Sequence, residues 1–327
     1  MKRLAVIDNY LGDAEKLVDW QRLRPEIEVE VFRDHFDDEE AIAERLREFE
    51  MLLVNRRATP ITGTLLEKLP KLEFIVTGGP ENPVIDVAAA RDRGIVVSGT
   101  PATNLYNVAE YTWGLIFAIG RNIVLEDRMT RAGQWHTSVG VELRDKTIGI
   151  LGLGKLGGDF AQMGSGFGAE FLAWSQNLTD ERCAEMGAER AASLDDLLTR
   201  SDFVVLLLRA GLRYQRLIGK REFELMKPTA YLINTGRAAL VDETAMIEAL
   251  ENGEIAGAAL DVYDVEPLPL DHSLRKFDNV VLSPHVAVHT RECRQSRYDL
   301  ILEDIQAFLD ADPIRELEVR DTQEAHH

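Results

Sequence analysis

Three ionisable residues in the second half of the chain each come at the end of an apolar segment. Arg237 follows AYLINT, Glu266 follows GAALDVY, and His285 lies within NVVLSPHV. In an open parallel sheet, ligands bind outside the carboxyl ends of the strands, so these side chains are placed to meet a ligand. Taken singly, each has an ordinary alternative: a solvated turn arginine, a loop acid and a hydrogen-bonded structural histidine.

Together the three residue types match what hydride transfer to a keto acid needs. A guanidinium grips a carboxylate through a bidentate pair and polarises a carbonyl. A histidine delivers a proton to the developing alkoxide near neutral pH, and a carboxylate beside a histidine favours its charged form. A nicotinamide cofactor would supply the hydride. We therefore predict Arg237 as the substrate ligand and His285 with Glu266 as the general acid and base pair.

A glycine-rich loop, GLGKLG, follows the apolar segment TIGIL and begins a helical segment. Gly152 permits a tight turn, Gly154 lets the backbone approach a pyrophosphate, and Gly157 lets the helix pack closely on the strand. The helix N-terminus favours an anion at the same place. We predict that this loop, with Lys155 and Leu156, binds a dinucleotide; the alternative is a structural turn.

The next apolar segment, FLAWS, ends in Ser175, where a dinucleotide site usually has an acid. An acid there holds the ribose hydroxyls of NAD and repels the 2′-phosphate of NADP. Gln176 and Asn177 can donate hydrogen bonds to such a phosphate, but no arginine stands immediately after Ser175. We predict NAD(H) or NADP(H) as the cofactor, with relaxed choice and a slight preference for NAD(H).

Charge and composition restrict the class of partner. The chain has 56 acidic and 37 basic residues and a net charge of −19, without a basic stripe to attract nucleic acid. Cys183 and Cys293 lack metal-ligand spacing and indicate neither a disulfide framework nor a metal site. The longest apolar stretch, residues 111–120, is too short to span a bilayer. We expect a cytoplasmic protein that binds neither nucleic acid nor a membrane.

Short apolar segments alternate with helical ones in two series, which is typical of parallel sheets covered by helices. A helical pattern over 104–132 separates the series, and a last amphipathic segment, 291–310, has no strand after it. The predicted fold class is α/β, with two doubly wound parallel-sheet domains joined by long helices. A discontinuous substrate domain takes 1–103 plus 291–327, and 104–290 form a dinucleotide-binding Rossmann domain.

The chain resembles the D-isomer-specific 2-hydroxyacid dehydrogenase family over nearly its whole length. The resemblance rests on GLGKLG (152–157), MKPTAYLINTGRAALVDE (226–243), GAALDVYDVEPLP (257–269) and LSPHVA (282–287). It implies a flavodoxin-like substrate domain, a Rossmann cofactor domain and a homodimer built through the long-helix region. The implied substrates are a small 2-oxo acid and its 2-hydroxy partner.

The resemblance also implies residue roles. It assigns Arg237, Glu266 and His285 as the catalytic triad and puts Asp261 near the nicotinamide carboxamide. The remaining residues that it implies for cofactor binding are Thr112, Thr235 and Gly236. In the segment VTGGPEN, the residues that it implies for binding the substrate carboxylate are Thr77, Gly78 and Gly79.

We predict an oxidoreductase that interconverts a 2-oxo acid and a D-2-hydroxy acid, with glyoxylate or hydroxypyruvate as the first specific substrates. Arg56 and Arg57 are candidates for a second cationic contact with substrate, or else a solvated basic pair. A formate dehydrogenase is disfavoured because those enzymes have a glutamine where this chain has Glu266. A different class, a dinucleotide-sensing interaction protein similar to corepressors, shares the fold and the triad, and an assay of cofactor oxidation separates the two.

Overall fold

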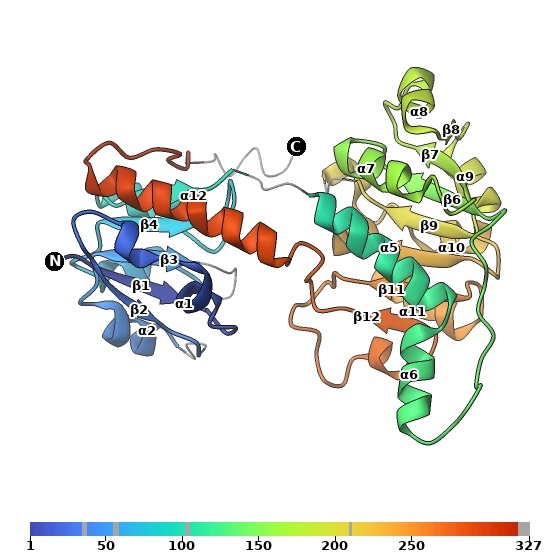
Figure 1. Cartoon of the computed structure of the whole chain (residues 1–327), viewed down its shortest axis with the longest axis horizontal. Helices are drawn as coiled ribbons and strands as arrows, with labels where there is room; N and C mark the ends of the chain where they lie inside the picture. Colours follow the sequence, from blue (N-terminus) through green and yellow to red (C-terminus); the bar gives the residue numbers. More distant parts are fainter. Residues whose placement is uncertain (35–37, 55–58, 102–104, 209–210, 320–327) are drawn as a thin grey trace. The chain divides into compact units, whose positions relative to one another are not determined.

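The computed structural model describes residues 1–34, 38–54, 59–101, 105–208 and 211–319. The chain forms two compact units, each built on one parallel sheet (Figure 1). Unit 1 takes the chain up to Asn104 and again from Thr290, and unit 2 takes Leu105–His289.

Unit 1 contains a five-stranded sheet in the order β2-β1-β3-β4-β5, with all neighbours parallel. This order is the flavodoxin-like form of the doubly wound sheet. Its inner strands are continuous apolar runs because helices cover both faces and leave neither to water. The strands are β1 Arg3–Ile7, β2 Glu28–Val31, β3 Met51–Val54, β4 Phe74–Thr77 and β5 Val96–Gly99.

The last long helix, α12 Arg291–Leu309, packs on this first sheet rather than on the second. Tyr298, Ile301 and Ile305 are buried in the same core cluster as Phe74, and the Phe308 ring stacks on Phe74 with 4.4 Å between centroids. The chain therefore returns to unit 1 after it has completed unit 2. The other helices of unit 1 are α1 Asp13–Leu17, η1 Trp20–Arg22, α2 Glu39–Leu46, α3 Gly63–Glu67 and α4 Val87–Asp92.

Unit 2 contains a seven-stranded parallel sheet in the order β12-β11-β10-β9-β6-β7-β8. The first strand of the unit, β6, lies between β7 and β9, so the strand order reverses beside it, as in a dinucleotide-binding Rossmann sheet. The strands are β6 Thr147–Leu151, β7 Glu170–Trp174, β8 Glu189–Arg190, β9 Phe203–Leu206, β10 Tyr231–Asn234, β11 Gly257–Leu260 and β12 Val280–Leu282. The predicted fold class is confirmed for both sheets.

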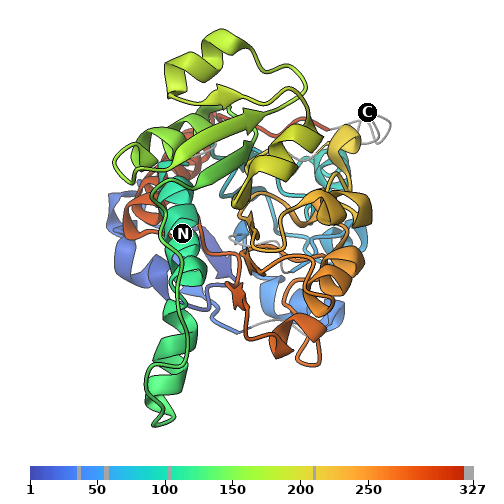
Figure 2. The same ribbon diagram turned by 90° about the vertical axis from the view of Figure 1, so that its right-hand side faces the viewer.

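Helices cover both faces of the second sheet (Figure 2). One core cluster joins the sheet to α5 (Tyr106–Gly120) and α7, and a second joins it to α9, α10 and α11. The bounds are α7 Lys155–Gly164, α8 Asp180–Met186, α9 Leu194–Arg200, η2 Leu212–Tyr214, α10 Lys220–Leu225, η3 Ala238–Leu240, α11 Glu243–Glu251 and η4 Ser273–Lys276. Because both faces are covered, the carboxyl edge of the sheet is the part of it that can meet a ligand.

The helical pattern predicted over 104–132 is two helices in the structure, α5 Tyr106–Gly120 and α6 Ile123–Arg131. The helix ends where Asn122 adopts a left-handed backbone, with φ at 52°. Asparagine tolerates that conformation better than most residues, because its short polar side chain bonds locally. The helical pattern predicted over 104–132 is thus interrupted at this asparagine. No helix that the structure describes is both long and apolar enough to cross a bilayer.

Candidate active site

The glycine-rich loop joins β6 to α7 beside the reversal in strand order. Gly152 has φ at 102°, and a Cβ there would come within 2.9 Å of the Leu208 backbone nitrogen. A Cβ on Gly157 would come within 2.0 Å of the Gly152 carbonyl oxygen. Side chains are thus excluded at both positions by backbone packing, as the sequence predicted from the glycine spacing.

Gly154 differs from its two neighbouring glycines, because a Cβ there would meet nothing within 4 Å among the described residues. Gly154 is also the N-cap of α7 and supplies no side-chain cap to the first N–H groups of the helix. Open space, uncapped N–H donors and the positive end of a helix dipole suit an anionic group. The loop therefore fits the pyrophosphate of a dinucleotide; contact of Gly154, Lys155 and Leu156 with a cofactor stays a prediction.

Arg182 of α8 holds this loop through its carbonyl oxygens. Its guanidinium donates to the carbonyl oxygens of Leu153 and Gly154, each at 3.1 Å, and pairs with Glu185 at 3.2 Å. The loop carbonyls consequently have a partner within the protein. This leaves the N–H side of the loop for a ligand.

Ser175 follows the last residue of β7 and lies next to the glycine turn. The Gly152 amide donates to the Trp174 carbonyl at 3.0 Å, which ties the turn to the end of β7. Ser175 is half-buried, and Gln176 and Asn177 beside it are exposed. The serine thus stands where a Rossmann site places the acid that binds the ribose.

The turn that holds Arg237 is shaped by a buried asparagine, Asn234. Its side chain accepts from the Gly236 amide and donates to the Arg237 carbonyl, both at 3.1 Å. The Arg237 side chain is exposed, and one guanidinium N–H donates to the Gly236 carbonyl at 2.7 Å. A guanidinium has five N–H groups, so most of them remain for an anion.

Thr112 and Thr235 lie together beneath that turn. Their hydroxyl oxygens are 2.7 Å apart, and Thr112 also donates to the Val108 carbonyl at 2.7 Å. A hydroxyl has one hydrogen, so Thr112 spends its own on Val108 and accepts that of Thr235. Both side chains are buried, and their hydrogens serve the packing of α5 on β10. Their contact with a cofactor stays a prediction.

His285 and Glu266 form a close pair. The distance between their side chains could not be predicted from the sequence. His285 Nδ1 is 2.7 Å from Glu266 Oε2, and the other carboxylate oxygen accepts from the Tyr263 amide at 3.0 Å. The two side chains are 47% and 35% exposed, so the pair is reachable from solvent. His285 also adopts a left-handed backbone, with φ at 54°, a conformation that is uncommon outside glycine and recurs at functional sites.

A buried carboxylate holds the loop that contains His285. Asp261 accepts from the Val286 and Ala287 amides, both at 2.9 Å, and from the Ser283 hydroxyl at 2.6 Å. Because Ser283 gives its hydrogen to Asp261, it accepts from the Tyr111 hydroxyl, 2.6 Å away. Asp261 is 1% exposed, so its observed role is to fix the histidine loop. Proximity to a nicotinamide carboxamide stays a prediction.

Tyr263 supports the same loop from the other side. Its hydroxyl donates to the Ser283 carbonyl at 2.9 Å and accepts from the Ser283 amide at 3.0 Å. Burial raises the pKa of Tyr263 to about 12, against a smaller lowering by the hydrogen bond to Ser283. The phenol therefore stays protonated at neutral pH and serves as a structural donor.

In unit 1, the loop after β4 contains the residues predicted to bind a substrate carboxylate. The Thr77 hydroxyl is buried and donates to the Val54 carbonyl at 2.8 Å, and the Gly79 amide donates to Thr100 Oγ1 at 2.8 Å. These two groups are thus engaged within the unit, and carboxylate binding by the loop stays a prediction. Arg56 and Arg57 lie outside the described residues.

Sequence reasoning missed two arginines that the fold brings to these regions. Arg213, from η2, donates to Gln176 Oε1 at 3.1 Å beside Ser175. Arg297, from α12, lies against the substrate loop, where a Cβ on Gly78 would come within 2.5 Å of its side chain. Arg213 is far from Gln176 in the sequence, and Arg297 is far from Gly78. No local motif could therefore have indicated either contact.

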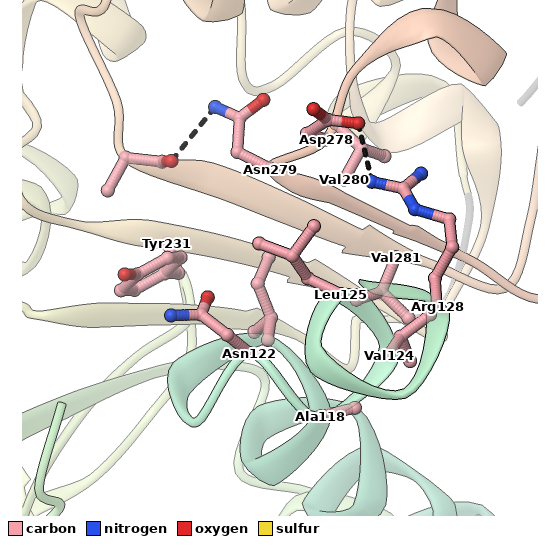
Figure 3. A pocket seen from close by; sticks show the side chains of 12 residues that line it. Ala118, Asn122, Val124, Leu125, Arg128, Tyr231, Asp278, Asn279, Val280 and Val281 are labelled. Atoms are coloured by element: carbon pink, nitrogen blue, oxygen red, sulfur yellow. Dashed lines mark hydrogen bonds and ion pairs between the residues drawn. The ribbon is translucent and has the colours of Figure 1, made fainter. Parts of the chain in front are cut away.

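A small pocket of about 70 Å³ lies elsewhere in unit 2, between α6 and the β11–β12 edge of the sheet (Figure 3). Arg128 pairs with Asp278 at 2.6 Å across its mouth. The pocket has room for only a few waters and is lined by none of the predicted site residues. It is therefore not the dinucleotide site.

Comparison with known proteins identifies the family. Residues 113–287 match the model of the D-isomer specific 2-hydroxyacid dehydrogenase NAD binding domain. A glyoxylate reductase from Aeropyrum pernix is 42% identical over 253 residues, which are 75% of each chain. A D-3-phosphoglycerate dehydrogenase from Methanocaldococcus jannaschii is 34% identical over 83% of this chain, but this chain spans only 52% of that protein.

A solved structure, a phosphoglycerate oxidoreductase from Vibrio cholerae, superposes with a TM-score of 0.87 at 31% identity. The match covers 95% of this chain and all of the other. The predicted resemblance, the enzyme class and a cofactor of NAD(H) or NADP(H) are confirmed by these matches. The chain, with its glycine loop and its paired histidine and glutamate, belongs to the D-isomer specific 2-hydroxyacid dehydrogenase family.

Proposed function

We propose that this protein reduces a small 2-oxo acid to the D-2-hydroxy acid, and catalyses the reverse oxidation, with a nicotinamide dinucleotide bound to unit 2. The observation that supports the proposal most directly is the contact of 2.7 Å between His285 Nδ1 and Glu266 Oε2, at the same sheet edge as Arg237. In the proposed division of labour, unit 2 binds the cofactor and unit 1 contributes to substrate binding.

The proposed mechanism assigns one task to each of three side chains. The bound cofactor supplies the hydride, which goes to the carbonyl carbon of the 2-oxo acid. Arg237 pairs with the substrate carboxylate and polarises the carbonyl through its forked N–H groups. Glu266 accepts from Nδ1 of His285, so Nε2 is the ring nitrogen left to protonate the carbonyl oxygen. The two electrons and one hydrogen would come with the hydride, and the second hydrogen is the proton that His285 Nε2 gives to the carbonyl oxygen, so that the step balances.

Asp261 acts through His285 in this mechanism. Its bonds to the Val286 and Ala287 amides fix the backbone that follows the histidine. The bonds between Tyr263 and Ser283 fix the backbone that precedes it. A histidine held at both ends keeps its ring against Glu266 without reorganisation when substrate arrives. We assign Asp261 as a positioning residue.

Glyoxylate and hydroxypyruvate are the proposed substrates. Two-carbon and three-carbon 2-oxo acids need one carboxylate contact and no further cation, which Arg237 supplies. The similarity to glyoxylate reductases over three quarters of each chain agrees with a small substrate.

Homodimeric assembly and a cytoplasmic location belong to the same proposal. The segment from α6 through residue 139 presents four apolar side chains that are each more than half exposed: Ile123, Val124, Trp135 and Val139. A surface of that kind is typical of an association site. Both described cysteines are free and buried, in keeping with a reducing compartment. Sedimentation velocity of the purified protein measures the oligomeric state.

A direct assay tests the proposed function. Purified protein is mixed with NADH or NADPH and with glyoxylate, hydroxypyruvate or pyruvate, and loss of reduced cofactor is followed by absorbance. We expect turnover with at least one acid, and hydroxypyruvate to give D-glycerate on chiral analysis, since glycolate has no stereocentre. Cofactor binding without turnover of any 2-oxo acid would overturn the enzyme proposal in favour of the dinucleotide-sensing alternative.

A further inference from the structure

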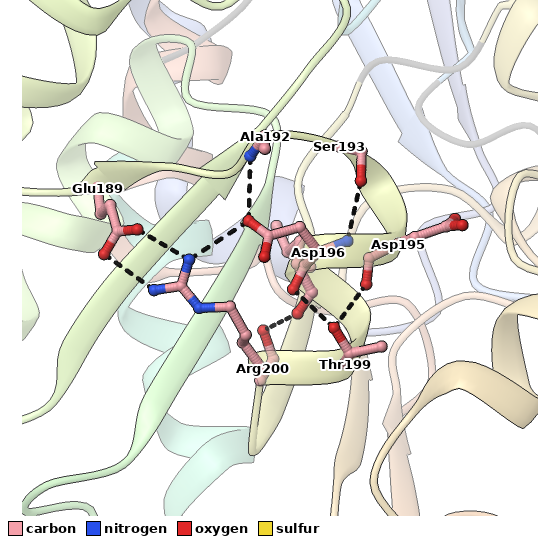
Figure 4. A network of polar contacts seen from close by, with 9 residues as sticks. Glu189, Ala192, Ser193, Asp195, Asp196, Thr199 and Arg200 are labelled. Atoms are coloured by element: carbon pink, nitrogen blue, oxygen red, sulfur yellow. Dashed lines mark hydrogen bonds and ion pairs between the residues drawn. The ribbon is translucent and has the colours of Figure 1, made fainter.

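Arg213 is one of the described arginines of unit 2 that lack a carboxylate partner, although the chain has a net charge of −19. Most arginines of unit 2 have a carboxylate partner; Arg200, for example, pairs with Glu189 at 2.8 Å and with Asp196 at 3.3 Å (Figure 4). Among the described residues, Arg213 has no acidic partner within ion-pair distance. Its recorded contacts are the Gln176 side-chain oxygen at 3.1 Å and the face of the Tyr214 ring, 5.7 Å from the guanidinium carbon.

The position of Arg213 follows from the strand order. η2 comes after β9, which pairs with β6 on the side opposite to β7. From there the side chain reaches Gln176, the second residue after β7. The guanidinium therefore lies at the turn that begins with Ser175, where a Rossmann sheet meets the 2′ position of the adenosine ribose.

Three features of the turn after β7 favour a negatively charged ligand there. The acid that would repel a 2′-phosphate is absent, because Ser175 occupies its position. The Arg213 guanidinium spends one N–H on Gln176 and retains four. The Gln176 side-chain amide has two further N–H donors in the same exposed turn.

Arg182, the other arginine near the loop, does not compete for this role. Its guanidinium already donates to the Leu153 and Gly154 carbonyls and pairs with Glu185. Arg213 keeps four N–H groups for a ligand, against two on Arg182.

We propose that Arg213, Gln176 and Ser175 form a binding site for the 2′-phosphate of NADP(H), so that this protein binds NADP(H) more tightly than NAD(H). The proposal deepens the proposed function, on which it rests for the place of the dinucleotide. It reverses the slight preference for NAD(H) predicted from sequence. That prediction sought an arginine directly after β7, whereas the fold supplies one from the loop after β9.

Binding of cofactor fragments tests the site without relying on turnover. Calorimetry or fluorescence titration of the full protein compares 2′,5′-ADP with 5′-AMP, and NADP⁺ with NAD⁺. We expect the phosphorylated member of each pair to bind about 10- to 100-fold more tightly, the scale of hydrogen bonds to a charged group. The difference should shrink as salt concentration rises.

Variants locate the effect. Arg213→Gln should remove most of the preference for 2′,5′-ADP and leave 5′-AMP binding unchanged. Arg216→Gln is the matched control, because Arg216 lies three residues away, is exposed and pairs with Asp242 at 3.5 Å. Ser175→Asp should reverse the preference by repelling the phosphate and binding the ribose hydroxyls. Unchanged thermal unfolding of each variant confirms that it is folded.

The outcomes separate this proposal from the proposed function. Equal binding of 2′,5′-ADP and 5′-AMP to the parent protein, or a preference that Arg213→Gln does not alter, would overturn the 2′-phosphate site. Either result leaves 2-oxo acid reduction untouched. Conversely, a strong Arg213-dependent preference supports the site even if none of the tested 2-oxo acids is turned over.

Discussion

Charged residues at the carboxyl ends of the two sheets differ in whether their hydrogen-bonding groups are used within the protein. At the end of β1 in unit 1, Asp8 is fully buried and accepts from both the amide and the hydroxyl of Thr59, at 3.1 and 3.0 Å. Next to it, Asp13 pairs with Arg294 of α12 and accepts from the Asn9 amide at 2.8 Å. Each carboxylate of this cluster is satisfied within its own unit.

At the corresponding edge of unit 2, Arg237, His285 and Arg213 are exposed or half-exposed and keep donors for something other than protein. The residues that hold the Arg237 turn and the His285 loop, Asn234, Asp261 and Tyr263, are buried and hydrogen-bonded within the protein. A charged residue at a strand end that is fully paired within the protein, like Asp13, stabilises the fold. A charged residue that is held in place but keeps free donors, like His285, can act on a ligand. We call the first arrangement a closed cluster and the second an open one.

Among the substitutions that test this difference, replacement of His285 should have the largest effect, a loss of catalytic rate. We expect His285→Ala to lower kcat for 2-oxo acid reduction by a factor of about 10² to 10⁴, the usual contribution of a general acid, with little change in thermal unfolding. The matched control is His272→Ala, which removes the imidazole of another histidine–glutamate pair in unit 2, at 3.0 Å from Glu243. Equal losses of kcat in the two variants would mean that the open pair has no special role.

Breaking the closed cluster should instead cost stability. Asp13→Ala leaves Arg294 partly buried without its partner, and we expect the free energy of unfolding to fall by about 3 kcal/mol. Urea denaturation measures it. Cofactor-fragment binding to unit 2 in the folded variant should stay unchanged, and a stability indistinguishable from that of the parent would show that the cluster is not a structural element.

The same cluster predicts an acid dependence. Burial favours the neutral form of Asp13, but the charge and hydrogen bond of Arg294 outweigh it and hold the pKa below the ordinary 3.8. A depressed pKa in the folded state gives stability that is fully present above the unfolded-state pKa and is lost as pH falls through the folded-state value. The difference in unfolding free energy between parent and Asp13→Ala should therefore shrink below about pH 4.

The smallest expected change comes from Glu266→Gln, which keeps the shape of the open pair and removes its negative charge. The rate of 2-oxo acid reduction should fall about tenfold, because a neutral amide is a weaker acceptor than a carboxylate for the His285 Nδ1 hydrogen and holds the ring less firmly. Steady-state kinetics of the parent and the variant measure the loss. A rate equal to that of the parent would argue against the pairing of Glu266 with His285 during the reaction.

Much of the local structure of unit 2 was predictable from sequence patterns. The glycine spacing predicted which positions tolerate no side chain, because a close turn and a close helix need Gly152 and Gly157 wherever they occur. Apolar runs followed by single polar residues predicted the strand ends that present Arg237, Glu266 and His285. Periodicity failed at the break between α5 and α6, since a left-handed asparagine interrupts a helix without interrupting its apolar pattern.

By itself, the sequence determined the strand and helix alternation, the dinucleotide loop and the three residue types suited to hydride transfer, because each depends on neighbours within a few positions. Only the tertiary structure decided which distant residues meet: His285 with Glu266 at 2.7 Å, Asp261 with the backbone beside His285, and Arg213 with Gln176. The physical reason is the parallel sheet, which brings residues from well-separated strands to one edge in an order that local patterns do not encode.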